Sequence, residues 1–287
     1  MAAENNATID PQVPAALAVR AEEIGAQKAG LDTISLLALS VLAGAFIAFG
    51  AMLSTVAATG AAGVLPYGVA RLIAGAVFSL GLILVVAGGA ELFTGNNLMV
   101  MAWASRRITT GRLLRAWAIV YAGNLVGGLG TAALVFLSGQ HGFAGGAVGA
   151  TALGIATAKV ALPPFQALML GILCNVLVCL AVWLCLGART IADRVLAIVP
   201  PVTAFVAAGF EHSIANMYFV PLGMMIRSGA SDGFWTAIGR SPDEFATLTL
   251  AGFLANLAPV TIGNVIGGAG LVGAVYWFIY LRGRRRQ

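Results

Sequence analysis

The chain has 287 residues, of which 60% are hydrophobic and only 9% are charged, and its formal net charge at pH 7 is +5. An ordinary soluble domain has about 25% charged residues, so this composition excludes a soluble globular protein and predicts an all-α, polytopic membrane protein. The basic residues are scattered over short loops, a distribution that does not fit a nucleic-acid partner.

Residues 1–30 contain no apolar signal-peptide core, and we expect them to form a cytoplasmic N-terminal segment. Within this segment, residues 15–29 fit either a short amphipathic helix on the membrane face or a disordered tail. The chain then continues as a single transmembrane channel domain, residues 31–281. It closes with a basic cytoplasmic tail, residues 282–287.

Six membrane spans are predicted in the channel domain, at about 34–60, 72–105, 113–137, 165–186, 195–226 and 247–280. The second span would be about 51 Å long as one helix. This is too long for a hydrocarbon core of about 30 Å. Gly88-Gly89 and the run Thr94-Gly95-Asn96-Asn97 interrupt it, and 209–216 interrupts the fifth span. We therefore predict that spans two and five are broken helices.

The two interrupted spans share one pattern. Its glycine, glutamate and asparagine recur 120 residues apart, as Gly89, Glu91 and Asn96 and as Gly209, Glu211 and Asn216. A second motif, Gly-Asn-x-x-Gly-Gly, occupies 123–128 and 263–268. Three spans per repeat force opposite orientations, so the sequence predicts two inverted repeats, at about 31–140 and 160–281, with a transport site between them.

The basic residues orient the spans. With both termini in the cytoplasm, 12 of the 16 lysines and arginines lie on the inner side, and four, Arg71, Lys159, Arg227 and Arg240, lie on the outer side. This asymmetry agrees with the positive-inside rule. It predicts a multi-pass protein of the cytoplasmic (inner) membrane in contact with its lipids.

The segments 90–96 and 210–217 resemble the two signature segments of the formate/nitrite transporter family. The resemblance covers about 15–281 and includes both interruptions, Lys159, Asn175 and Gly263-Asn264. It implies an aquaporin-like fold that assembles as a homopentamer with one pore per protomer. It also implies transport of protons and small monovalent weak-acid anions: formate first, then nitrite, with hydrosulfide, acetate or lactate in some branches.

His212 is the one histidine in an apolar span, and an ionisable group there indicates function. The resemblance implies that it lies in the pore beside Thr94, where it donates a proton to the anion or polarises it. The alternatives are a histidine fixed by hydrogen bonds at the break and a threonine that caps the next half-helix. The resemblance also implies pore positions for Asn175 and Asn264, whose amides can bridge loop backbone or contact the anion. Asn124 is expected to be structural.

The resemblance further implies two apolar constrictions beside the histidine, formed by Phe78, Leu82, Leu92, Phe93 and Phe205. A narrow apolar ring resists a bare anion and admits the neutral acid. Lys159 is interpreted as a lone cation that either snorkels to the interface or attracts anions to a vestibule.

The buried carboxylates are expected to hold the loops at the two breaks by accepting backbone N–H bonds. This group of loop-structuring residues is Glu91, Glu211, Asn96 and Asn216. Two negative charges that lined the pore would repel an anion.

No catalytic cluster, cofactor motif or metal-ligand spacing occurs, and the three cysteines are interpreted as buried small hydrophobes. The sequence therefore predicts a transporter that is not an enzyme and needs no cofactor. An aquaporin-like channel for neutral solutes is the alternative from a different class. The absence of paired Asn-Pro-Ala boxes weighs against it.

Overall fold

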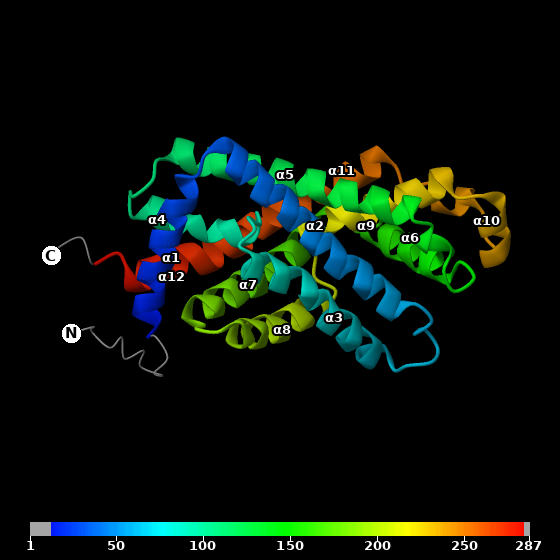
Figure 1. Ribbon diagram of the computed structural model, residues 1–287, viewed down its shortest axis with the longest axis horizontal. Helices are drawn as coiled ribbons and strands as arrows, with labels where there is room; N and C mark the ends of the chain where they lie inside the picture. The colour runs from blue at the N-terminus through cyan, green and yellow to red at the C-terminus, as the bar shows by residue number, and fades with distance from the viewer. Residues whose placement is uncertain (1–12, 284–287) are drawn as a thin grey trace, which may run out of the picture.

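The computed structural model describes residues 13–283, and this part of the chain consists of helices joined by loops, with no strand (Figure 1). The predictions for 1–12 and for 284–287 of the basic tail fall outside the described residues. The elements are α1 (Pro14–Ala29), α2 (Thr33–Ala58), α3 (Tyr67–Gly88), η1 (Gly95–Met99), α4 (Val100–Ala104), α5 (Thr110–Leu137), η2 (Gln140–Gly142), α6 (Ala147–Val160), α7 (Pro164–Gly187), α8 (Ile191–Ala207), α9 (Ser213–Gly229), α10 (Asp232–Ile238), η3 (Pro242–Phe245), α11 (Leu250–Val265), η4 (Ile266–Ala274) and α12 (Val275–Tyr280).

The predicted spans are present. Within residues 13–283, five helical stretches are long and apolar enough to cross a membrane: α2, α3, α5, α7 and the continuous stretch 242–280. The fifth predicted span is divided into α8 and α9, which have 17 residues each. A helix of that length is about 26 Å long, which is shorter than a hydrocarbon core of about 30 Å. The two halves must therefore cross the membrane together. The predicted breaks in spans two and five are both confirmed.

Both breaks begin with the same backbone turn. Gly89 and Gly209 adopt left-handed conformations, with φ of 73° and 76°. The next residue then reaches back to the helix: Ala90 N–H donates to the carbonyl of Val85 at 2.9 Å, and the Phe210 N–H donates to that of Phe205 at 3.0 Å. This hydrogen bond ends a helix in the Schellman manner, which only glycine accommodates without strain.

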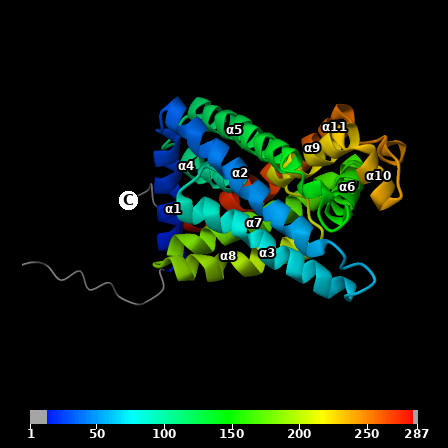
Figure 2. The ribbon, with the colours of Figure 1, turned by 45° about the vertical axis from the view of Figure 1, so that its right-hand side comes forward.

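The two halves of the chain pack in the same way. Helix α2 lies against α3 and α5, and α7 lies in the same manner against α8 and α11. Between the halves, α3 contacts α8 and α5 contacts α9, and the views in Figures 1 and 2 show α3 and α8 side by side. Glycines permit close packing here: a methyl group at Gly127 would collide with the Val41 carbonyl, and one at Gly267 with the Ile172 carbonyl.

Two shorter helices complete this correspondence. Helix α1 packs its buried face on η1, α4, α7 and α12, so the disordered-tail alternative for 15–29 is wrong. Helix α6, which the sequence analysis did not predict, packs on α9. Each ends with a lysine in its last turn, Lys28 or Lys159, placed four residues before the N-cap of the next long helix. The positions of α1 and α6 therefore correspond, and they lie near opposite ends of the molecule (Figure 2).

Candidate functional site

One asparagine fastens each break to the long helices. The side chain of Asn124 accepts from the Phe93 N–H at 2.9 Å and donates to the carbonyls of Ser40 at 2.7 Å and Glu91 at 2.9 Å. These three bonds use one acceptor and both donors of the amide. The expectation that Asn124 is structural agrees with this geometry.

Asn264 repeats the arrangement in the second half. It accepts from the Ser213 N–H at 2.9 Å and donates to the carbonyls of Gly171 at 2.8 Å and Glu211 at 3.0 Å. Both of its amide donors are therefore engaged with backbone. The sequence left two roles open for Asn264, a bridge between backbone segments and a contact to the anion. These three bonds correspond to the bridge.

A lysine and an asparagine hold each buried carboxylate. Glu91 accepts from Lys28 Nζ at 3.0 Å and from Asn96 Nδ2 at 2.7 Å. In the other half, Glu211 accepts from Lys159 Nζ at 2.8 Å and Asn216 Nδ2 at 2.7 Å. The expectation of backbone N–H donors to these carboxylates is wrong, because among the described residues their donors are side chains.

These ion pairs change the interpretation of Lys159. It was interpreted as a lone cation, but its side chain is only 14% exposed and is bonded to Glu211, whose side chain is 6% exposed. A buried carboxylate without a partner is costly, and the lysine supplies that partner. The positive charge of Lys159 is therefore balanced within 3 Å.

His212 connects the two breaks. Its Nδ1 accepts from the Ala215 N–H at 3.1 Å, which makes the imidazole the N-cap of α9. Its Nε2 lies 3.0 Å from Thr94 Oγ1 in the other break. Because Nδ1 acts as an acceptor, the neutral ring carries its proton on Nε2, and Nε2 donates to the Thr94 hydroxyl. The Thr94 side chain makes no capping bond to η1, so the capping alternative for this threonine is wrong.

Asn175 lies behind Thr94. Its Nδ2 donates to the carbonyl of Thr94 at 3.3 Å, to Asn97 Oδ1 at 2.8 Å and to the carbonyl of Asn264 at 2.6 Å. Cys179 Sγ adds a weak contact to the Thr94 carbonyl at 3.3 Å. Asn175 is thus buried beneath the first break, where it holds the backbone that carries the Thr94 hydroxyl.

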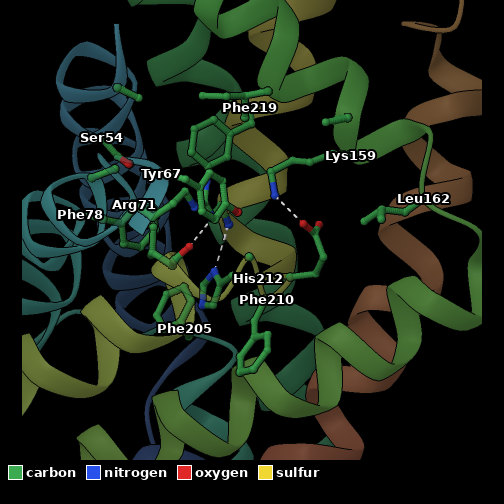
Figure 3. Close-up of a pocket in the computed structure, with 18 residues that line it drawn as sticks. Ser54, Tyr67, Arg71, Phe78, Lys159, Leu162, Phe205, Phe210, His212 and Phe219 are labelled. Carbon is green, nitrogen blue, oxygen red and sulfur yellow. Dashed lines mark hydrogen bonds and ion pairs between the residues drawn. The ribbon is translucent and has the colours of Figure 1, made fainter. Parts of the chain in front are cut away.

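Two cavities lie beside the breaks: His212 lines the first, and Gly95, the neighbour of Thr94, lines the second. The first, the Lys159 cavity, has a volume of about 320 Å³ and includes Arg71, Phe78, Lys159, Phe205 and His212 in its lining (Figure 3). The second, the Lys28 cavity, has a volume of about 240 Å³, and its lining includes Arg20, Lys28, Leu82, Leu92 and Arg194. Helix α3 contributes to both, with its N-terminal half at the first cavity and its C-terminal half at the second.

Apolar side chains occupy the region between the cavities. The rings of Phe78 and Phe205 meet edge to face with centroids 5.7 Å apart, and Phe205 stacks on the His212 imidazole at 5.9 Å. Leu82 and Leu92 face the Lys28 cavity. Phe93, which the sequence grouped with them, instead packs on Tyr121 at 4.9 Å and lines neither cavity.

Four residues of the site were not predicted from the sequence: Lys28 as the partner of Glu91, and Arg20, Arg71 and Arg194 in the cavity walls. A signal for Lys28 was present, because Lys28 precedes the first long helix by the same number of residues as Lys159 precedes the fourth span.

The chain is similar to known proteins over nearly its whole length. The family model described as formate/nitrite transporter matches residues 15–278. The chain belongs to this family of membrane transporters. It is 48% identical over 274 residues to the formate channel FocA of Escherichia coli (strain K12), an alignment that covers 95% of this chain and 96% of the relative. It is 39% identical to the probable formate transporter of Methanothermobacter thermautotrophicus, with 89% of this chain and 92% of the relative covered.

Two solved structures have the same fold. One is described as a pentameric formate channel with formate bound; it is 42% identical, with a TM-score of 0.83 and coverage of 87% of this chain and 98% of that one. The other is described as an ion channel of the same family; it is 29% identical, with a TM-score of 0.77 and coverage of 92% and 98%. The predicted family and fold class are confirmed.

Proposed function

We propose that this protein is a channel for formate and related small weak-acid anions, which cross its barrier as the neutral acid after protonation near His212. The observation that carries the proposal is the pair of cavities separated by Phe78, Phe205, Leu82 and Leu92, with His212 in the lining of the first cavity and 3.0 Å from Thr94 of the other break. The similarity to formate channels supports formate as the first substrate, with nitrite next. Hydrosulfide, acetate and lactate are the alternatives within the family.

The mechanism follows from the charges and the apolar layer. An anion enters the Lys159 cavity, where the net charge of the lining is positive. To pass Phe78 and Phe205 as a bare ion it would lose its hydration without an equivalent partner, at a cost of several kcal/mol. Protonation removes that cost. The acid crosses in its neutral form and releases its proton in the Lys28 cavity.

His212 is the proposed proton donor, acting through the hydrogen on Nε2. A ring with protons on both nitrogens would lose the bond between Nδ1 and the Ala215 N–H and would uncap α9. The neutral ring is therefore the resting form. When a proton from the water of the cavity reaches Nδ1, the bond to the Ala215 N–H opens, the imidazolium donates its Nε2 hydrogen to the anion, and the neutral ring that remains regains its resting tautomer by proton exchange with water. In the resting form Thr94 Oγ1 accepts the Nε2 hydrogen at 3.0 Å, so donation to the anion requires this bond to be exchanged for one to the solute.

The remaining assignments are part of the same proposal. The similarity to a pentameric formate channel supports a homopentamer with one pore per protomer. The asymmetry of lysines and arginines supports a location in the cytoplasmic membrane, with both termini, residues 1–30 and 282–287, in the cytoplasm. The Lys159 cavity then opens to the outside and the Lys28 cavity to the cytoplasm. The transport steps use no cofactor and no covalent chemistry on the solute.

Uptake by proteoliposomes tests the substrate. Labelled formate is offered alone and in competition with nitrite, hydrosulfide, acetate and lactate, and water permeability is measured on the same vesicles. We expect saturable formate uptake that nitrite inhibits most strongly. Water or glycerol flux without formate flux would overturn the proposal in favour of a channel for neutral solutes.

A further inference from the structure

The Lys159 cavity holds one cation that no carboxylate balances. Lys159 is paired with Glu211 at 2.8 Å, so these two lining residues together carry no net charge. Arg71 also lines the cavity, and among residues 13–283 no carboxylate lies within ion-pair distance of it. The positive charge available to a solute in this cavity is therefore that of Arg71.

The contacts of Arg71 leave part of its guanidinium available. Nε donates to the Ala207 carbonyl at 3.3 Å, and one Nη donates to the Val206 carbonyl. Both acceptors are neutral carbonyls at the C-terminal end of α8. A guanidinium has five N–H donors in a planar fork that suits carboxylate oxygens, and the two bonds described for Arg71 use two of them.

Arg71 lies on the same face of α3 as Phe78, a residue of the barrier. It lies three and seven residues before Ala74 and Phe78, so the three share one helical face, and all three line the cavity. Seven residues correspond to about 10 Å along the helix axis. Figure 3 shows Arg71 in the same cavity wall as Phe78, Phe205 and His212.

We propose that Arg71, rather than Lys159, concentrates the anion at this mouth of the pore. The inference rests on the proposed function, since it concerns an anion that reaches His212 from the Lys159 cavity. A unit charge several ångströms from the ion raises its occupancy about threefold in a water-like dielectric, and by more where the cavity walls lower the dielectric constant. The contacts to Val206 and Ala207 fix the guanidinium at that place.

The experiment must separate the charge of Arg71 from its contacts to α8. The variant Arg71→Cys is labelled in detergent with a methanethiosulfonate that adds a trimethylammonium group or with one that adds a sulfonate. The protein is then reconstituted, and formate influx is measured at low and at high ionic strength. The unchanged chain receives the same reagents, because it has three buried cysteines of its own.

We expect Arg71→Cys to lower influx about three- to tenfold at low salt. The cationic label restores influx to within about twofold of the unchanged chain, and the anionic label lowers it further. High salt reduces these differences, because the Debye length falls from about 10 Å at 0.1 M to about 3 Å at 1 M. Equal influx with both labels would overturn the inference.

Arg227→Gln is the matched control. Arg227 is also half-buried and donates to two carbonyls, those of Pro242 and Leu248, but it lies outside the Lys159 cavity. Its substitution is expected to leave influx within about twofold, and a loss as large as that in Arg71→Cys would contradict the role of cavity charge. If Arg71→Cys fails to assemble, Arg71→Lys and Arg71→Gln decide, and equal influx in these two variants refutes the inference. Absence of formate influx in the unchanged chain would instead refute the proposed function.

Discussion

The two ring nitrogens of His212 hold different parts of the molecule, and one substitution separates them. Nδ1 caps α9 by accepting from the Ala215 N–H at 3.1 Å, whereas Nε2 lies 3.0 Å from the Thr94 hydroxyl. In His212→Asn, the side-chain oxygen can take over the cap, since asparagine is a favoured N-cap residue. The shorter side chain ends before Thr94 and carries no group that exchanges protons near neutral pH. We expect this variant to fold normally and to lose proton-coupled formate flux.

The expected magnitudes distinguish the two roles. Loss of the hydrogen bond to Thr94 costs about 1 kcal/mol of folding free energy, and loss of the cap costs about 1 kcal/mol more. His212→Asn should therefore lose about 1 kcal/mol and His212→Ala about 2 kcal/mol. Flux should fall equally in both, by about 100-fold or more, because a positioned proton donor contributes about 10²- to 10⁴-fold to proton transfer.

The assay uses proteoliposomes that contain a pH-sensitive dye, with formate added outside at several pH values. For the unchanged chain, flux should rise as the external pH falls, because the neutral acid becomes easier to form. Ionic current is recorded on the same preparations, since removal of the imidazole can also open the barrier to the bare anion. If His212→Asn keeps the rate and the pH profile of the unchanged chain, the histidine only caps α9 and the proton-donor mechanism is refuted.

Three further predictions concern other parts of the structure. Phe205→Ala should admit acetate and lactate at a raised rate in the uptake competition, because it removes a ring from between the cavities, whereas Phe93→Ala should leave selectivity unchanged, because that ring lines neither cavity. Lys159→Met should destabilise the protein by about 3 kcal/mol, because it leaves Glu211 buried without its cation. In thermal unfolding, the second change Glu211→Gln should restore most of this loss. An equal loss in the single and double variants would contradict the pairing. Burial lowers the pKa of His141 below its ordinary value of 6.5. The unfolded chain therefore binds the proton more readily, and the stability of the protein should fall as the pH drops below about 6.5. His141→Gln should flatten this dependence in a pH series of unfolding temperatures, and an unchanged slope would refute the assignment.

The breaks and the central histidine could be predicted from the sequence because polar residues and glycines are unusual within apolar, membrane-spanning segments. Backbone groups in a membrane must be satisfied within the protein, so glycine, asparagine and glutamate in an apolar run indicate where a helix is interrupted. The same reasoning identified Glu91, Glu211 and His212. Each of these residues can be recognised from its immediate neighbours in the sequence, without knowledge of distant contacts.

Other features depend on contacts between distant segments. Lys28 and Glu91 are 63 residues apart, and nothing local to either residue indicates that they pair. Helix α6 is short and composed mostly of small apolar residues, so it has neither the length of a span nor an amphipathic pattern. The direction of Phe93 follows from the course of the chain through the break, where helical periodicity no longer applies. Its contact with Tyr121 was therefore not predictable.

The two halves share a scaffold but differ in the chemistry that they bring to the barrier. The paired clamps of Asn124 and Asn264 hold both breaks in the same way. At the offset of 120 residues that relates the breaks, however, His212 corresponds to Leu92 and Thr94 corresponds to an isoleucine. One repeat thus supplies the imidazole and the other supplies the hydroxyl that orients it. A strictly symmetric pore would place two imidazoles or none between the cavities. Under the proposed mechanism, one imidazole would exchange protons with a solute from either cavity, and a single residue would serve transport in both directions.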